Sequence, residues 1–98
     1  MAFFKAALTQ VNKLDVAIIW LDTKYLDDDD EIKKEAKFFK ELLDCPNVVI
    51  MILDEEEKPV YYGYPSIVDI LKRTSWKKYP WKSYELGKTV TEGEAPNS

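Results

Sequence analysis

Two uninterrupted apolar runs, residues 16–21 and 48–53, mark the centre of this chain. Both are short and rich in β-branched side chains, which is typical of strands that are buried on both faces of a sheet. An amphipathic stretch separates them, so the pattern predicts a strand–helix–strand unit with parallel strands. The residues that we expect in the core of this unit are Ile18, Ile19, Leu21, Phe39, Val49, Ile50 and Ile52.

The helix of this unit is predicted over residues 29–43. The acidic residues 27–30 would cap the N–H groups of its first turn and oppose its dipole. One side of the helix is apolar, and its outer side carries opposite charges four residues apart. The apolar stripe is Ile32, Ala36, Phe39 and Leu43, and the expected ion pairs are Asp29 with Lys33, Asp30 with Lys34, and Lys37 with Glu41.

The flanking segments have weaker patterns. Residues 2–13 place apolar side chains at helical spacing, so we predict an amphipathic opening helix. Residues 60–62 predict a short strand that pairs antiparallel with the second apolar run. Pro65 favours the start of a helix, and Pro80 allows only irregular or edge-strand structure over residues 76–86.

These elements predict an α/β protein with a small, mostly parallel central sheet that is covered by helices. Its βαβ unit is followed by a β-hairpin, in a three-layer arrangement. The length of 98 residues fits one domain, which we assign to residues 1–87. Residues 88–98 lack large apolar side chains apart from Val90, so we predict a disordered tail there.

The predicted order helix, strand, helix, strand, strand, helix resembles a trimmed thioredoxin fold. Residues 63–67 (GYPSI) also resemble the cis-proline segment of that superfamily. The two points compete, because a cis-proline at Pro65 implies a strand over residues 67–71 and not a helix. The redox cysteines of the superfamily would fall at residues 22–26 (DTKYL), where this chain has none. The resemblance therefore implies a redox-inactive member that is used for binding.

Composition narrows the chemistry. The chain has no histidine and a single cysteine, Cys45. It therefore lacks the residues for a Ser-His or Cys-His nucleophile, a structural zinc site or an internal disulfide. We predict no cofactor and interpret Cys45 as a small apolar residue. Neither a signal peptide nor an apolar run of the roughly 20 residues that span a bilayer is evident, so we expect a cytoplasmic protein without a membrane partner.

Asp22 and Asp54 each follow directly on one of the apolar runs. In a parallel sheet both lie at the carboxyl edge, where α/β proteins bind ligands. Together with residues 27–30 and 55–57, they are weak candidates for oxygen ligands of Mg²⁺. Turn and cap roles explain the same carboxylates, and no Lys, Ser or Thr motif completes a catalytic set. A magnesium-dependent enzyme is therefore the alternative and not the main hypothesis.

Charge is segregated along the chain. Residues 22–57 carry a net charge of −8, and residues 58–98 carry a net charge of +3. The centre of the basic half, residues 72–84, combines five cations and four aromatic side chains with no acid. This combination suits a protein hot spot or single-stranded nucleic acid. The same residues would also serve as a cover for the core, with lysines that reach outward into solvent.

We therefore predict a non-catalytic protein-binding or regulatory module. Its partner is another protein with an acidic surface or a second copy of the chain, whose residues 27–30 would supply that surface. The net charge of −4 argues against nucleic acid, which remains a further alternative for residues 72–84. The predicted binding residues are Lys72, Arg73, Trp76, Lys78, Tyr79, Trp81 and Lys82.

Overall fold

The chain opens with a β-hairpin. Asn12 and Lys13 have φ angles of 50° and 70°, and they join β1 (Phe3–Val11) to β2 (Leu14–Leu21). Positive φ at both central positions is the geometry of a type I′ turn, whose twist matches that of antiparallel strands. The structure, a computed structural model, describes residues 3–85.

The sheet has five strands in the order β4-β3-β2-β1-β5. β2 is parallel to β3, and the other three neighbouring pairs are antiparallel. The sheet is therefore mixed, and the expectation of a mostly parallel sheet is wrong. The remaining elements are η1 (Thr23–Tyr25), α1 (Asp29–Leu43), β3 (Val48–Leu53), β4 (Pro59–Tyr62), α2 (Pro65–Leu71), η2 (Trp76–Lys78) and β5 (Trp81–Glu85).

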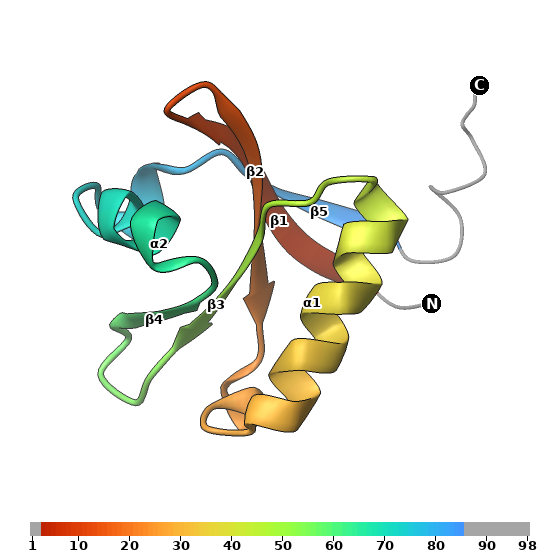
Figure 1. Ribbon diagram of the computed structural model, residues 1–98. Helices are drawn as coiled ribbons and strands as arrows, with labels where there is room; N and C mark the ends of the chain where they lie inside the picture. Colours follow the sequence, from red (N-terminus) through yellow and green to blue (C-terminus); the bar gives the residue numbers. More distant parts are fainter. Residues whose placement is uncertain (1–2, 86–98) are drawn as a thin grey trace.

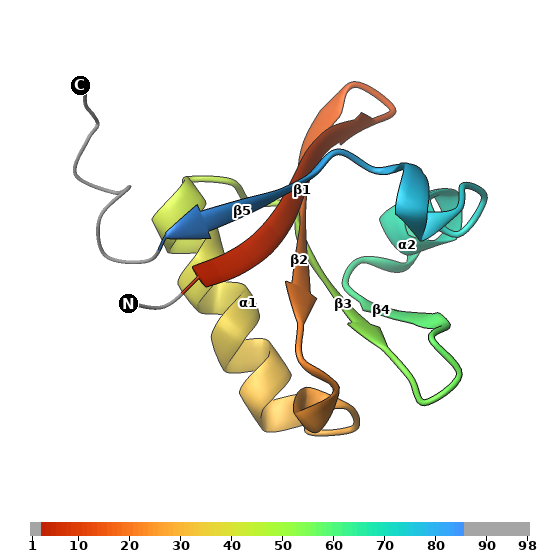
Figure 2. The same cartoon turned by 180° about the vertical axis from the view of Figure 1, so that it is seen from behind.

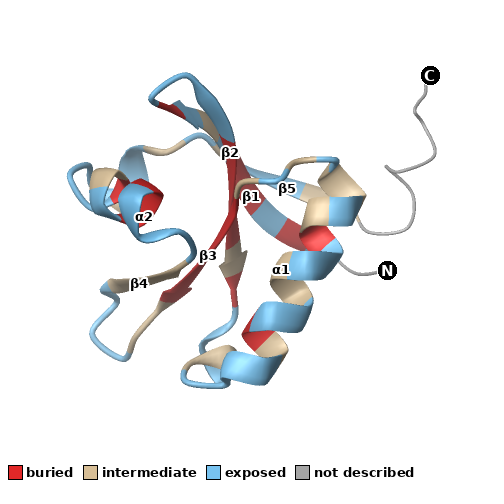
Figure 3. Cartoon of the chain, viewed as in Figure 1, coloured by how far each residue is buried: buried red, intermediate tan, exposed pale blue. Residues whose placement is uncertain are grey.

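Helices cover both faces of the sheet. α1 lies on one face, and α2 with η2 lies on the other (Figure 1, and from behind in Figure 2). We call these the α1 side and the α2 side. Successive residues of β2 alternate between them, so Ile19 packs on the α1 side and Ile18 on the α2 side. Figure 3 shows the buried residues along the central strands and on the inner sides of the helices.

The central unit agrees with its prediction. β2, α1 and β3 form the strand–helix–strand unit, and β4 pairs antiparallel with β3. All seven expected core residues are buried. Asp28 caps α1 by accepting a hydrogen bond from the backbone N–H of Glu31 at 3.3 Å. The described residues form none of the three expected ion pairs, and Lys34 pairs with Glu31 in place of Asp30, at 3.4 Å.

The opening helix predicted over residues 2–13 is wrong, since residues 3–11 form β1 and residues 12–13 form the turn after it. Phe3 and Leu8, which the helical spacing placed on the apolar face, are 66% and 52% exposed. Ala6 and Ala7 are fully buried on opposite sides of the sheet. β1 pairs with β2 on one edge and with β5 on the other, so tertiary pairing overrides the local helical spacing.

Pro65 is in the first turn of α2. Of the two interpretations of this proline, the one that starts a helix is therefore confirmed. The thioredoxin-like order of elements also loses its first helix, which is β1 here. Residues 76–85 form η2 and the edge strand β5, in agreement with the expected edge strand. The tail predicted at residues 88–98 lies outside the described residues.

Replacing Phe39 with alanine should lower the free energy of unfolding by about 3–5 kcal/mol. Phe39 is 2% exposed, and its ring centroid lies 4.8 Å from that of Phe4. Phe38 on the same helix is 45% exposed, so Phe38→Ala is the control and should cost less than about 1 kcal/mol. Urea unfolding of both variants measures the difference, and equal losses would show that the helix face is assigned wrongly.

Candidate functional site

The three tryptophans of the chain meet on the α2 side of the sheet. Trp20 comes from β2, Trp76 from η2 and Trp81 from β5. The ring centroid of Trp20 lies 5.1 Å from that of Trp76 and 5.4 Å from that of Trp81, and both contacts are edge-to-face. All three residues are only partly buried. We call these three residues the tryptophan cluster.

Hydrogen bonds hold the cluster in place. The indole N–H of Trp81 donates to the carbonyl oxygen of Trp76 at 2.7 Å. The hydroxyl of Tyr79, between them, donates to the carbonyl oxygen of Leu71 at the end of α2, at 2.8 Å. Trp81 lies opposite Ala7 of β1, and the small alanine leaves room for the indole. The indole of Trp81 and the ring of Tyr79 are therefore oriented before any partner binds.

Two lysines lie over the rings. The Nζ of Lys5 is 4.7 Å from the ring centroid of Trp20, and the Nζ of Lys77 is 5.9 Å from that of Trp76. Both distances are within the range of cation–π contact. Within residues 3–85, the ion pairs are Lys34 with Glu31 and Lys58 with Glu56. The positive charges over the cluster are therefore not neutralised by a neighbouring carboxylate in the described chain.

The structure divides the predicted site residues between two faces. Trp76, Tyr79 and Trp81 pack together on the α2 side. Lys72, Arg73 and Lys78 are exposed at the end of α2 and on η2. Lys82 follows Trp81 in β5, so it points to the α1 side. Tyr84 is also on the α1 side, where its ring stacks on Phe4 at 5.3 Å.

Trp20, Lys5 and Lys77 were not among the predicted binding residues. A signal for Trp20 was present, because it is the aromatic member of the alternating set with Ile18 in the first apolar run. Lys5 was not predicted as a site residue, because a helix was expected over residues 2–13. In the β1–β2 hairpin, Lys5 lies directly opposite Trp20, which is the arrangement that places its ammonium group over the indole ring.

Tyr61 on β4 contributes a buried polar group to the same side. Its hydroxyl is buried and has no hydrogen-bond partner among the described residues. Burial, with a smaller contribution from Tyr79, raises the pKa of Tyr61 from 10.0 to about 12. Burial also raises the pKa of Tyr79, whose hydroxyl does have a partner. Replacing each tyrosine with phenylalanine therefore removes a hydroxyl without a hydrogen-bond partner in one case and a hydroxyl with a partner in the other.

Asp22 and Asp54 lie in adjacent loops at one edge of the sheet, as expected. The hydroxyl of Thr23 joins these loops by donating to the carbonyl oxygen of Leu53 at 3.1 Å. Asp22 accepts a hydrogen bond from the N–H of Lys24, and Asp54 accepts from two N–H groups of its own turn. Over residues 3–85, no three acidic, histidine or cysteine side chains are grouped to hold a metal ion. The observed roles of both carboxylates are local.

Comparisons of the chain with protein-family models, with curated proteins and with solved structures find no match. The resemblance to the thioredoxin superfamily therefore depends on the sequence alone and stays a prediction. No helix within the described part of the chain is long and apolar enough to span a membrane.

Replacing Tyr61 with phenylalanine should leave the free energy of unfolding unchanged or raise it by about 1 kcal/mol, because the variant removes a buried hydroxyl that has no partner. Tyr79→Phe is the matched change and should lower the free energy by about 0.5–1.5 kcal/mol, because it removes a 2.8 Å hydrogen bond. Urea unfolding at neutral pH compares them. A loss in Tyr61→Phe as large as that in Tyr79→Phe would contradict the assignment.

Alkaline pH should destabilise the protein through Tyr61. Because its pKa is raised in the folded state from 10.0 to about 12, folding favours the neutral phenol. This contribution is fully present below pH 10 and is lost as the pH rises towards 12. Over that window, the free energy of unfolding should fall more steeply in the parent protein than in Tyr61→Phe. Parallel slopes for the two proteins would refute this role.

Proposed function

We propose that this chain is a non-catalytic binding module that recognises an acidic surface of another protein through the tryptophan cluster. The observation that carries the proposal is the set of three partly exposed tryptophans with two lysines over their rings that form no ion pair within residues 3–85. Tryptophan, tyrosine and arginine dominate the energetics of protein interfaces. Because ring contacts and the hydrogen bond of the Trp81 indole already hold the cluster, a partner loses little of its binding energy to ordering it.

The cations around the cluster support an acidic partner. Lys72, Arg73 and Lys78 are exposed at the adjoining end of α2 and on η2, and they extend the positive charge that Lys5 and Lys77 begin. Charges at the rim of an interface increase the rate of encounter and select the partner. A second copy of the chain is one source of such an acidic surface, because its residues 27–30 are exposed.

Two other functions remain as alternatives with less support. Single-stranded nucleic acid would also use rings and lysines, but the chain has a net charge of −4. A magnesium-dependent enzyme would need Asp22 and Asp54, whose carboxylates serve the local turns. The experiment on the cluster therefore includes a nucleic-acid probe.

Intrinsic tryptophan emission reports the proposed surface directly, because all three tryptophans belong to it. We expect polyglutamate, used as an acidic probe, to change the emission at low salt. The charge-reversal variant Lys5→Glu with Lys77→Glu should weaken this binding at least about tenfold, since it places like charges against the probe. Raising the ionic strength should weaken it as well.

The matched control is Lys34→Glu with Lys37→Glu, which changes the net charge equally on exposed positions of α1. It should retain binding within about twofold, and circular dichroism checks that both variants are folded. Tighter binding of oligothymidylate than of polyglutamate would replace the proposal with the nucleic-acid alternative. Equal losses in both double variants would show that only net charge matters and that the cluster is a cover for the core.

A further inference from the structure

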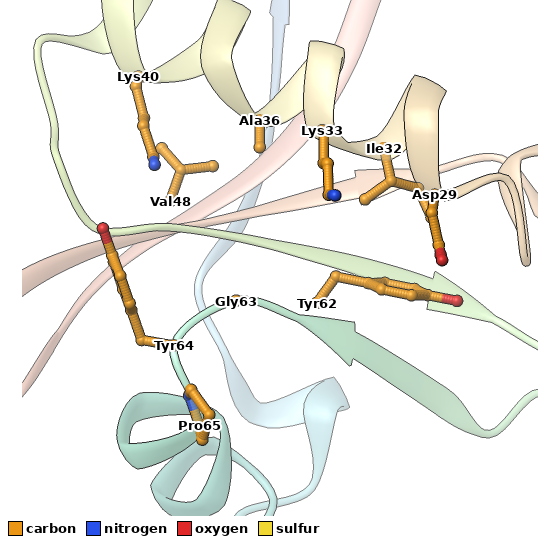
Figure 4. Close-up of a pocket in the computed structure, with 10 residues that line it drawn as sticks. All are labelled: Asp29, Ile32, Lys33, Ala36, Lys40, Val48, Tyr62, Gly63, Tyr64 and Pro65. Carbon is orange, nitrogen blue, oxygen red and sulfur yellow. The ribbon is translucent and has the colours of Figure 1, made fainter.

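A groove lies on the opposite side of the molecule from the tryptophan cluster. It runs between α1 and the edge strand β4 and has a volume of ≈ 340 Å³. Ile32 and Ala36 from α1 and Val48 from β3 make its floor apolar (Figure 4). We call it the α1–β4 groove. Its volume lies at the lower end of the range of about 300–1,000 Å³ that is typical of small-molecule sites.

The chain path after β4 shapes this groove. Tyr62 forms part of its far wall, and the chain then turns at Gly63 towards α2. A Cβ atom on Gly63 would lie 3.0 Å from Cγ2 of Val49, so glycine permits the close passage against β3. Tyr64 follows and stands at the rim, 51% exposed. The floor thus lies between the side chains of Tyr62 and Tyr64 (Figure 4).

Two lysines of α1 point into the groove (Figure 4). Lys33 and Lys40 are seven residues apart, which is about 10 Å along a helix. The Nζ of Lys40 lies 5.6 Å from the ring centroid of Tyr64. Neither lysine is in the ion pairs of residues 3–85, although Asp29 was expected to pair with Lys33. Among the described residues, neither ammonium group is thus within ion-pair distance of a carboxylate, although Asp29 lines the same groove.

The acidic side chain of the groove is at its other end. Asp29 lies beside Tyr62, and Lys40 lies beside Tyr64 (Figure 4). An anionic group is therefore favoured at the Lys40 end, whereas a second anionic group near Asp29 would be repelled, and Lys33 lies between the two ends. The space between the two tyrosines is apolar and suits a flat ring. The groove thus selects one negative charge at one end of an apolar body.

We propose that the α1–β4 groove binds a small aromatic monocarboxylate. The carboxylate pairs with the ammonium group of Lys40 at the Tyr64 end, Lys33 adds positive charge along the groove, and the ring rests on the apolar floor between Tyr62 and Tyr64. This site is separate from the tryptophan cluster, since the groove and the cluster lie on opposite sides of the sheet. Its occupation does not require the proposed protein partner.

The test uses 2-naphthoate as the probe and the full chain labelled with ¹⁵N. On addition of naphthoate, we expect the protein's amide resonances of Val48 and Gly63, which line the groove, to shift. The amide resonances of Trp76 and Trp81 should not change. The neutral analogue 2-naphthalenemethanol has the same ring system without the carboxylate and should bind at least about tenfold more weakly. That difference isolates the contribution of the two lysines from that of the apolar floor.

Matched variants locate the charge. Lys33→Gln with Lys40→Gln should weaken naphthoate binding at least about tenfold, whereas Lys34→Gln with Lys37→Gln on the same helix should change it less than about twofold. Glutamine is a good helix former, so both variants should keep α1 intact. The proposal is overturned if naphthoate shifts no groove resonance, if it shifts those of the tryptophan cluster instead, or if the neutral analogue binds equally well.

Discussion

The central strands β2 and β3 have no polar face where they pair, and this constraint determines the rest of the molecule. Every residue from Val48 to Ile52 in β3 is buried, and so is every residue of β2 from Val16 to Ile19. Both faces therefore need a cover. On one side α1, with fifteen residues, supplies it. On the other side α2 has only seven, which is about 10 Å of helix, and the tryptophan cluster with Tyr79 completes the cover.

This arrangement gives the aromatic rings two roles at once. Each tryptophan packs against the α2-side core and still keeps part of its ring exposed. Truncating a ring would therefore cost stability as well as contact area. Lys5 and Lys77 are exposed, so replacing either lysine should cost little stability. Specificity of the proposed surface is thus adjustable through charge, while the rings stay fixed by the demands of the fold.

Net charge is a poor guide to what either proposed site attracts. The chain carries a net charge of −4, yet lysines outside the ion pairs of residues 3–85 lie at the tryptophan cluster and in the α1–β4 groove. The principal dimensions of the described molecule are 38 × 31 × 22 Å, whereas the Debye length at physiological ionic strength is about 8 Å. Charges at opposite ends are therefore largely screened from each other, and short-range chemistry decides what binds.

What the sequence failed to predict about the site follows from one segment whose secondary structure was predicted wrongly. Residues 16–21, 29–43 and 48–53 were predictable because burial on both faces and a capped amphipathic helix leave strong local patterns. Residues 3–11 have apolar spacing that fits a helix, and only pairing with β2 and β5 makes them a strand. The register of that strand sets Lys5 opposite Trp20 and Ala7 opposite Trp81. A helix over these residues gives no reason to place Lys5 beside Trp20, so the sequence did not connect either residue with the basic segment 72–84. Alternation along β5 then separates Lys82 from Trp81, which no count of charges along the chain detects.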